Sequence, residues 1–386
     1  GLSAALHLAE KGVQVALIEA QAIGFGASGR NGGQIHTGLR QNQKALERWL
    51  GKDHARALWD LAQEAKALVR DLAARHGIDC ALKDGLVIAA HNRRALHRLG
   101  EETEYLRTHY GYGAASMMDA TQTAQQLGTS AYPGARLDMG GGHLHPLAFA
   151  QGLARAGEVA GVHIYEHTRA IRIEQDGRCA RVQTESGAID AGLVILACDA
   201  QSGAVVPQLA PFIAPVESFI VATEPLAEDL YNAILPCDAA VADTRHVLDY
   251  YRKSEDRRLL FAGRESYWTP PADIAATVRP RMESAFPALK GARIEFAWSG
   301  TVGITRTRMP HFGRIGARMF FAHGYSGQGV ALANLGGKLL AEAAMGDLER
   351  FDVFARVPAK PFPGNKMLRA PLVAAGLAWF KLLDYF

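Results

Sequence analysis

The sequence has few residues of the kinds that cross-link or anchor a chain. Only four of its 386 residues are cysteine, and none of them forms a CxxC pair or another metal-ligand spacing. No apolar run approaches the roughly 18–20 residues that a membrane-spanning helix needs. We therefore predict no disulfide framework, no zinc site and no transmembrane helix, and a reducing cytoplasm fits this cysteine usage best.

An excess of charge of one sign is also missing. The net charge is only +3, so the overall charge predicts no nucleic-acid partner and no membrane-binding surface. The 14 histidines are scattered, and no metal site is expected from them. With 48% hydrophobic and 21% charged residues, the composition is that of a globular protein, and the length suggests about two domains.

The first 20 residues have the pattern of a helix, a tight turn and a buried strand. Residues 1–12 place apolar side chains on one helical face, and residues 13–20 (VQVALIEA) form the strand. In dinucleotide-binding units a glycine begins such a helix, and an acidic residue follows about 20 residues later. Gly1 and Glu19 fit these two positions. We expect that the preceding strand and first two glycines are absent, unless this is an amphipathic helix and strand without a nucleotide.

The next stretch, GFGASGRNGG at 24–33, contains five glycines in ten residues. A loop of this composition cannot build a core. It is either a flexible connector or a segment whose backbone N–H groups lie against a flat, anionic ligand.

Two later stretches also combine turns, helices and buried strands. Residues 141–146 read as a turn, Pro146 begins a helix, and the near-continuous apolar run LVILACDA at 193–200 reads as a buried parallel strand. Residues 319–343 read as strand, glycine turn (324–329) and helix. The start of such a helix presents unsatisfied N–H groups and a partial positive charge.

In this order, the stretches at 23–34, 141–174 with 191–202, and 321–343 resemble the FAD-dependent amine and amino-acid oxidase family, which includes D-amino acid, glycine and sarcosine oxidases. The resemblance covers almost the whole chain. It implies a mixed α/β fold, with a Rossmann-like FAD-binding domain beside a substrate domain built on an antiparallel sheet. The expected FAD-binding domain is 1–79, 141–202 and 306–352. The substrate domain is 80–140 and 203–305, and 353–386 is a C-terminal extension.

The resemblance also implies a set of cofactor-binding residues. Those expected to bind FAD are Gly1, Glu19, Ala27, Ser28, Arg30, Asn31, Gly32, Gly33, Ala170, Ala197, Gly324, Ser326, Gly327, Gln328 and Gly329. Glu19 would hold the adenosine ribose, and Ser28 and Arg30 would lie at the phosphates. The turn 324–329 would face the flavin pyrimidine. The covalent flavin cysteine of some relatives has no match here, so FAD is expected to bind non-covalently.

The substrate site is less defined by sequence. Tyr250, Tyr251, Arg306 and Tyr325 are the candidates, and only one of the adjacent tyrosines can face the flavin side of its strand. Relatives that act on sarcosine carry a lysine soon after the glycine turn, whereas here no cation appears before Lys338. This difference implies an amine without a carboxylate on the reacting carbon, such as γ-glutamylputrescine. Arg40, Arg306 or Arg308 could hold a distant carboxylate.

The resemblance implies oxidation of a carbon–nitrogen bond to an imine and then an aldehyde, with O₂ as acceptor and hydrogen peroxide as product. No acid or base residue is singled out, and no oligomeric state is predicted. An alternative is a dehydrogenase that passes electrons to a quinone. Its only cue is residues 366–386, where aromatic and aliphatic side chains near 379–383 lie among Arg369 and Lys381 and would allow membrane contact. A second alternative is a fragment that binds no cofactor and has no activity.

Overall fold

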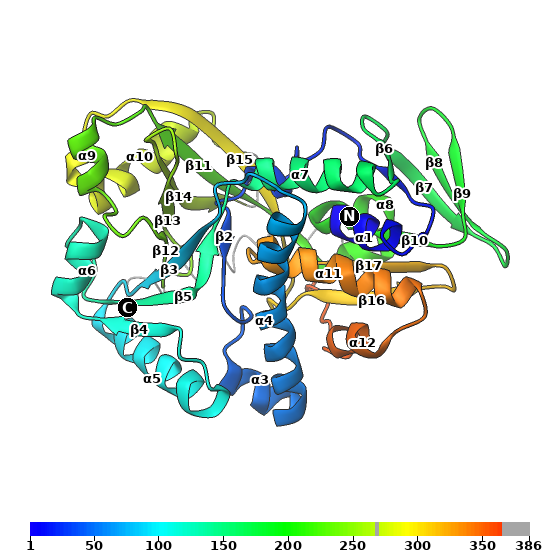
Figure 1. The fold of residues 1–386 in the computed structure, drawn as a ribbon, viewed down its shortest axis with the longest axis horizontal. Coiled ribbons are helices and arrows are strands. Elements are labelled where there is room, and N and C mark those ends of the chain that lie inside the picture. Colours follow the sequence, from blue (N-terminus) through cyan, green and yellow to red (C-terminus); the bar gives the residue numbers. More distant parts are fainter. Residues whose placement is uncertain (267–269, 365–386) are drawn as a thin grey trace.

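The computed structural model describes residues 1–266 and 270–364, and Figure 1 shows two groups of elements on either side of helix α4 (Lys52–Arg75). One group holds a nine-stranded sheet, and the other holds small sheets with helices packed on them. The mixed α/β class with a second, mostly antiparallel sheet is therefore confirmed. The predicted domain boundaries stay a prediction.

The group with the small sheets contains short parallel strands, which lie in two sheets. β1 (Ala16–Ile18) pairs in parallel with β6 (His163–Tyr165). β10 (Val194–Leu196) pairs in parallel with β17 (Met319–His323), which pairs antiparallel with β16 (His311–Ile315). Every residue of β17 is buried, as the apolar sequence predicts. The strand predicted over 13–20 is thus confined to its centre.

Three helices pack against each other beside these strands: α1 (Leu2–Ala9), α7 (Pro146–Val159) and α11 (Gly329–Ala344). A side chain at Gly337 would come within 2.7 Å of the backbone nitrogen of Ala4, so α1 and α11 approach each other closely. α7 begins at Pro146, as predicted. Its Phe149 and Leu153 are buried in the same core as Leu6 of α1.

The remaining elements of this group are small. They are the antiparallel sheet β7 (Ala170–Gln175), β8 (Ala180–Thr184) and β9 (Ala188–Ala191), and the helices α2 (Ala27–Arg30), α3 (Gln43–Leu50), α8 (Ser202–Val205), α12 (Glu349–Ala355), η1 (Asp199–Gln201) and η2 (Pro207–Phe212).

The nine-stranded sheet has the order β15 (Ile294–Ile304), β11 (Ala214–Thr223), β14 (Leu259–Ser266), β13 (Tyr250–Lys253), β12 (Ala240–Asp243), β3 (Lys83–Ala89), β5 (Ala135–His143) and β2 (Gln34–Ile35), with β4 (Ala115–Met118) beside β5. All of its pairs are antiparallel except β12 with β3. The predicted hairpin with its turn at 254–256 is confirmed as β13–β14. The turn predicted over 141–146 is wrong in its first half, because residues 141–143 complete β5 and pair with β2 and β3.

Four helices and a 3₁₀ turn accompany this sheet: α5 (Arg93–Tyr110), α6 (Ala120–Leu127), α9 (Glu228–Ala233), α10 (Ile274–Ala285) and η3 (Pro287–Leu289). α10 covers β11, β14 and β15, and a second core forms there. Tyr251, Phe261 and Phe286 are its largest side chains and are fully buried.

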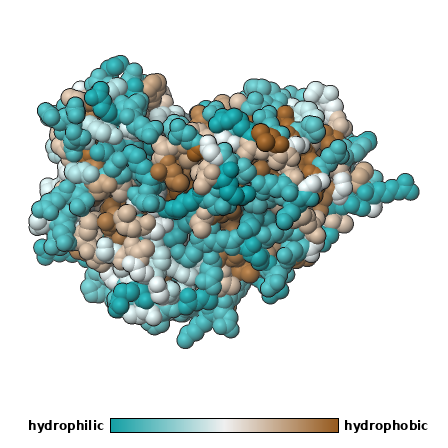
Figure 2. All heavy atoms as spheres, viewed as in Figure 1, coloured by the Kyte–Doolittle hydropathy of each residue, from teal (hydrophilic) through white to brown (hydrophobic). Residues whose placement is uncertain are grey.

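The face shown in Figure 2 is mainly polar, with small apolar patches between the polar residues. Within the described part of the chain, no helix is both long and apolar enough to span a bilayer. The membrane contact considered for 366–386 lies outside the described residues.

Candidate functional site

The start of helix α1 lies where β1 and β10 end. A Cβ on Gly1 would lie 3.7 Å from the Cβ of Ala197, which follows β10. The Gly1 nitrogen also lies within electrostatic range of Glu19 and Cys198. Gly1, Glu19 and Ala197 are therefore brought together, as the sequence predicts for a nucleotide site at the carboxyl ends of parallel strands.

The Glu19 segment is joined to the chain leading into β7. The backbone N–H of Thr168 donates to the carbonyl oxygen of Glu19 over 2.8 Å, and Ala170 begins β7 two residues later. One carboxylate oxygen of Glu19 accepts a hydrogen bond from the backbone N–H of Gln21 over 2.9 Å. Ala170 therefore lies near Glu19, although β7 and β1 belong to different sheets.

The loop 24–33 is tightly packed. A Cβ on Gly29 would come within 2.2 Å of the carbonyl oxygen of Gly24, and one on Gly33 within 1.9 Å of that of Leu144. Gly33 also has φ +75°, which favours glycine. This close packing is not the arrangement of a flexible Gly/Ser connector.

Two polar side chains of this loop turn back onto the protein. Arg30 donates from Nε to the carbonyl oxygen of Phe25 over 2.6 Å and from Nη1 to that of Ser299 over 3.3 Å. Asn31 donates to the carbonyl oxygens of Ala27 and Ser28 and accepts from the backbone N–H of Gly33 over 2.7 Å. Both side chains therefore stabilise the loop, whereas Ser28 is exposed.

Hydrogen bonds from the backbone to Asp199 hold the glycine turn 324–329 in place. The Asp199 carboxylate accepts hydrogen bonds from the backbone N–H groups of Gly324, over 2.7 Å, and Gly303, over 3.1 Å. Burial raises the pKa of Asp199, and its backbone hydrogen bonds oppose that shift. Sequence reasoning did not single out Asp199; its signal is an acidic residue at the end of a buried strand.

Ser326 and Gln328 complete the turn. The backbone N–H of Ser326 donates to the carbonyl oxygen of Gly303 over 3.1 Å, and Ser326 has φ +52°. Gln328 precedes the first residue of α11 and gives no side-chain cap to the helix. Its buried Oε1 has no hydrogen-bond partner among the described residues.

These features fit an anionic dinucleotide. The N-termini of α1 and α11 both lack a side-chain cap, so their first N–H groups are available to an anion. A Cβ on Gly26 or Gly327 would meet no atom within 4 Å, which leaves the backbone accessible there. The unpartnered amide oxygen of Gln328 can accept a hydrogen bond from a ligand N–H.

The structure distinguishes the two adjacent tyrosines. Tyr251 is only 1% exposed and packs against Phe261 and Phe286 in the second core. Tyr250 points to the opposite face, where a Cβ on Gly32 would lie 2.8 Å from its ring. Its hydroxyl lies 3.0 Å from that of Ser218. Tyr250 is therefore the one placed beside the glycine-rich loop.

Trp298 lies beside the same loop. Its indole N–H donates to the carbonyl oxygen of Arg30 over 3.0 Å. Tyr325, in contrast, lies along α11, where a Cβ on Gly336 would come within 2.8 Å of its hydroxyl.

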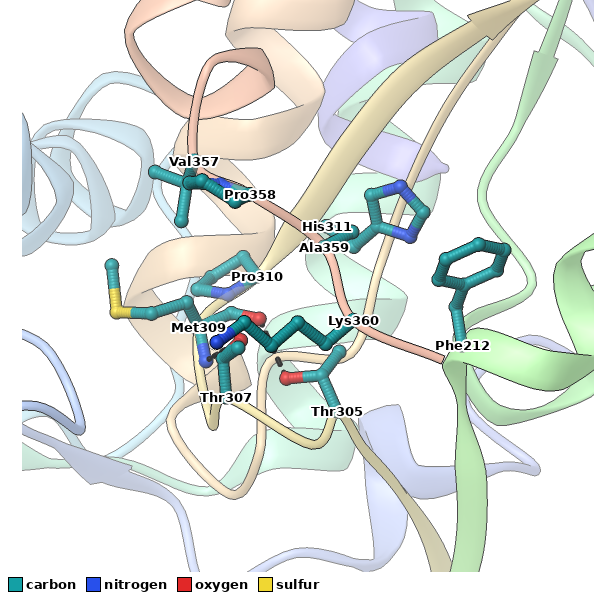
Figure 3. A pocket seen from close by; sticks show the side chains of 10 residues that line it. All are labelled: Phe212, Thr305, Thr307, Met309, Pro310, His311, Val357, Pro358, Ala359 and Lys360. Atoms are coloured by element: carbon teal, nitrogen blue, oxygen red, sulfur yellow. Dashed lines mark hydrogen bonds between the residues drawn. The ribbon is translucent and has the colours of Figure 1, made fainter. Parts of the chain in front are cut away.

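Arg306 points toward a C-terminal segment of the chain. Its Nη1 donates to the carbonyl oxygen of Pro361 over 3.3 Å. Figure 3 shows the pocket between the turn 305–310 and residues 357–360, with the Lys360 side chain lying across it. Within residues 1–266 and 270–364, no group of three or more histidine, cysteine, aspartate or glutamate side chains could hold a metal ion.

Comparison with known proteins identifies the class. The model of the DAO family, described as FAD dependent oxidoreductase, matches residues 1–343. The chain belongs to this family of flavin-dependent enzymes, which act on amines and amino acids. FAD is therefore its cofactor, although the individual FAD-contacting residues remain predictions.

The chain is similar over its full length to two curated proteins. It is 40% identical to gamma-glutamylputrescine oxidoreductase of Escherichia coli (strain K12), covering 100% of this chain and 90% of that protein. It is 39% identical, with the same coverage, to the probable oxidoreductase OrdL of Rhizobium meliloti (strain 1021). The crystal structure of glycine oxidase from Geobacillus kaustophilus shares the fold, with a TM-score of 0.78 at 22% identity over 93% of this chain and 96% of that one.

Proposed function

We propose that this enzyme oxidises a primary amine that has no carboxylate on the reacting carbon, with γ-glutamylputrescine as the model substrate. The products are an aldehyde, ammonia and, with O₂ as acceptor, hydrogen peroxide. The 40% identity to gamma-glutamylputrescine oxidoreductase over the whole chain supports this substrate class.

One structural observation carries the proposal. The first two turns of α11, which follow the glycine turn, contain no cationic side chain. The first cation of that helix, Lys338, donates to the carboxylate of Glu64 over 2.8 Å. A carboxylate next to the reacting amine would therefore find no partner on this helix, and burying it unpaired costs several kcal/mol.

The protein's own residues would bind FAD, orient the amine and exclude water from the site. The starts of α1 and α11, the loop 24–33 and Glu19 would hold FAD, which supplies the two-electron acceptor for oxidation of a carbon–nitrogen bond. Tyr250 and Trp298 lie beside that loop and would form an apolar wall around the amine. An amine enclosed by apolar groups favours its neutral form, which is the form that can be oxidised.

The test is anaerobic bleaching of the flavin absorbance by different amines at equal concentration. We expect γ-glutamylputrescine to bleach it faster than glycine, sarcosine or D-alanine. Admitting O₂ should restore the absorbance and produce hydrogen peroxide, whereas a quinone-dependent enzyme would need an added acceptor. Fastest bleaching by D-alanine or sarcosine would replace the proposal with an amino-acid oxidase, and a protein that retains no FAD would refute it.

A further inference from the structure

Arg252 is a buried cation that reaches the glycine-rich loop from the nine-stranded sheet. It lies on β13 and is only 5% exposed. Its Nε donates to the carbonyl oxygen of Gly32 over 2.8 Å, across 220 residues of sequence. A second bond runs from its Nη1 to the carbonyl oxygen of Lys253 over 3.1 Å. The bond to Gly32 places the guanidinium in direct contact with the loop 24–33.

The face of β13 that carries Arg252 is the face toward this loop. Side chains two residues apart on a strand lie on the same face. Tyr250 precedes Arg252 by two residues, and a Cβ on Gly32 would lie 2.8 Å from its ring. The side chains of Tyr250 and Arg252 therefore both contact Gly32.

The charge of Arg252 has no carboxylate partner within the described part of the chain. The nearby Asp238 pairs with Lys83 over 2.6 Å, and Asp256 pairs with Arg258 over 2.5 Å. Burial lowers the pKa of Arg252 to about 10, and the charges of Asp238 and Asp256 act against that shift. The guanidinium is therefore charged at neutral pH, and no salt bridge neutralises it.

A chain of hydrogen bonds leads from Arg252 into the loop. The peptide that accepts from Arg252 joins Gly32 to Gly33, and the N–H of Gly33 donates to Oδ1 of Asn31 over 2.7 Å. Asn31 in turn donates from Nδ2 to the carbonyl oxygen of Ala27 over 2.8 Å. All three donors point away from Arg252, so the bonds polarise one another in the same sense. The positive charge therefore acts along the loop as well as at Gly32.

We propose that Arg252 is a positioning residue of the flavin site. It fixes the Gly32–Gly33 peptide and supplies a positive charge that favours the singly charged anion that FAD becomes when it takes two electrons and one proton from the amine. This inference rests on the proposed function, in which the loop 24–33 holds FAD. A charged donor makes a stronger hydrogen bond than a neutral one, which suits the first role. A buried cation without a salt bridge suits the second role, because charges interact strongly where water is excluded.

The midpoint potential of the bound FAD, measured against a reference dye without any amine, tests the role of the charge. A unit charge that acts over about 10 Å of protein interior changes an ionic equilibrium about tenfold. We therefore expect Arg252→Gln and Arg252→Met each to shift the reduction equilibrium about tenfold toward oxidised FAD, which is a fall of about 30 mV for two electrons. Arg252→Lys keeps the charge and should shift the equilibrium less than about threefold.

Lys253→Met is the matched control, because it removes a buried cation from the next position of the same strand. Lys253 is 7% exposed and pairs across the hairpin with Leu259 of the second core. Its Nζ donates to the carbonyl oxygen of Tyr231 over 3.4 Å, on the face of β13 opposite to Arg252. The control should therefore shift the equilibrium less than about threefold. Equal falls in potential for Lys253→Met and Arg252→Met would overturn the inference.

The Kd for FAD, measured by flavin fluorescence, tests the positioning role. We expect it to rise about tenfold in Arg252→Met, because the loop loses a charged hydrogen bond, and to rise less in Arg252→Gln, which can still donate to Gly32. An unchanged Kd in Arg252→Met would remove this role. Urea denaturation of each apoprotein shows whether the variant folds. If Arg252→Met does not fold, the comparison of Arg252→Gln with Arg252→Lys decides, because both can donate but only one is charged.

Because the potential is measured without an amine, it also separates this inference from the proposed function. A potential that falls in Arg252→Gln and is kept in Arg252→Lys supports the inference even if γ-glutamylputrescine does not bleach the flavin. Equal potentials in these two variants overturn it even if γ-glutamylputrescine is oxidised.

Discussion

Asp199 and Gly324 are joined by a hydrogen bond of 2.7 Å from the Gly324 backbone N–H to the Asp199 carboxylate. The bond fixes the glycine turn to the end of β10, 125 residues earlier in the chain. The second carboxylate oxygen holds Gly303 in β15, over 3.1 Å. One half-buried side chain therefore sets the position of the glycine turn relative to β15.

Replacement of Asp199 by alanine should destabilise the protein and weaken FAD binding. Two buried N–H groups would lose their acceptor, at about 1–3 kcal/mol each. We expect the free energy of unfolding to fall by about 2–4 kcal/mol, measured by urea denaturation of the FAD-bound enzyme. Asp199→Asn keeps one acceptor oxygen and should lose less than half of this. An equal loss in both variants would show that the charge matters more than the hydrogen bonds.

Gly26→Ala tests whether FAD lies against the glycine-rich loop. A Cβ at this position meets no protein atom within 4 Å, so the apoprotein should unfold at an unchanged urea concentration. If the backbone there approaches FAD closely, the added methyl group should raise the Kd for FAD about tenfold or more, as measured by flavin fluorescence. Gly187→Ala, at an equally open position in the β8–β9 turn, is the control. Unchanged FAD affinity in Gly26→Ala would remove this loop from the cofactor site.

The buried histidine pair His311 and His323 predicts loss of stability in acid. Nδ1 of His311 lies 2.9 Å from Nε2 of His323, and burial lowers the pKa of His311 to about 4 and that of His323 to about 3. Because the unfolded chain takes up these protons near pH 6.5, the folded state loses stability as the pH falls from about 6.5 toward 4.

His323→Gln should make that loss smaller. Between pH 7.5 and 5.5, the variant should lose about 1.4 kcal/mol less unfolding free energy than the wild type, which corresponds to one histidine over one pH unit below 6.5. Urea denaturation at the two pH values gives both quantities. The same pH dependence in the two proteins would contradict the assignment of His323 as a neutral buried histidine.

The adjacent tyrosines should respond differently to substitution. Tyr251→Ala removes a ring from the second core and should cost about 3–5 kcal/mol of unfolding free energy. Tyr250→Phe removes one hydroxyl, which lies 3.0 Å from Ser218, and should cost only about 1 kcal/mol. On the proposed function, Tyr250→Phe should nevertheless slow flavin reduction by γ-glutamylputrescine in stopped-flow measurements. A larger kinetic effect from Tyr251→Phe would indicate that Tyr251, and not Tyr250, faces the candidate flavin site.

The sequence is informative where structure is determined locally. Pro146 begins α7 because proline suits the first turn of a helix, and 254–256 form the turn of the β13–β14 hairpin between alternating strands. The spacing of Gly1 and Glu19 also places both residues at the same end of the parallel strands.

Relationships between distant segments could not be predicted in this way. Arg30 follows a glycine and is suited by its charge to a phosphate, yet two of its N–H donors bind the carbonyl oxygens of Phe25 and of Ser299, which lies 269 residues away. Residues 141–143 of the turn predicted over 141–146 belong to a strand, because β2 and β3 supply partners on both sides. The hydrogen bond from Gln41 to Thr307 likewise joins two loops that are distant in sequence, and no local pattern indicates it.

The contact between α1 and α11 has a consequence for biosynthesis. Ser3 donates to the carbonyl oxygen of Asn334 over 2.6 Å, across 331 residues of sequence. At about 5–20 residues per second on the ribosome, α1 waits roughly 20–70 seconds before its partner helix is made. The part of α1 that packs on α11 is therefore available to chaperones throughout that interval, and the contact between the two helices can form only after residue 334 has left the ribosome.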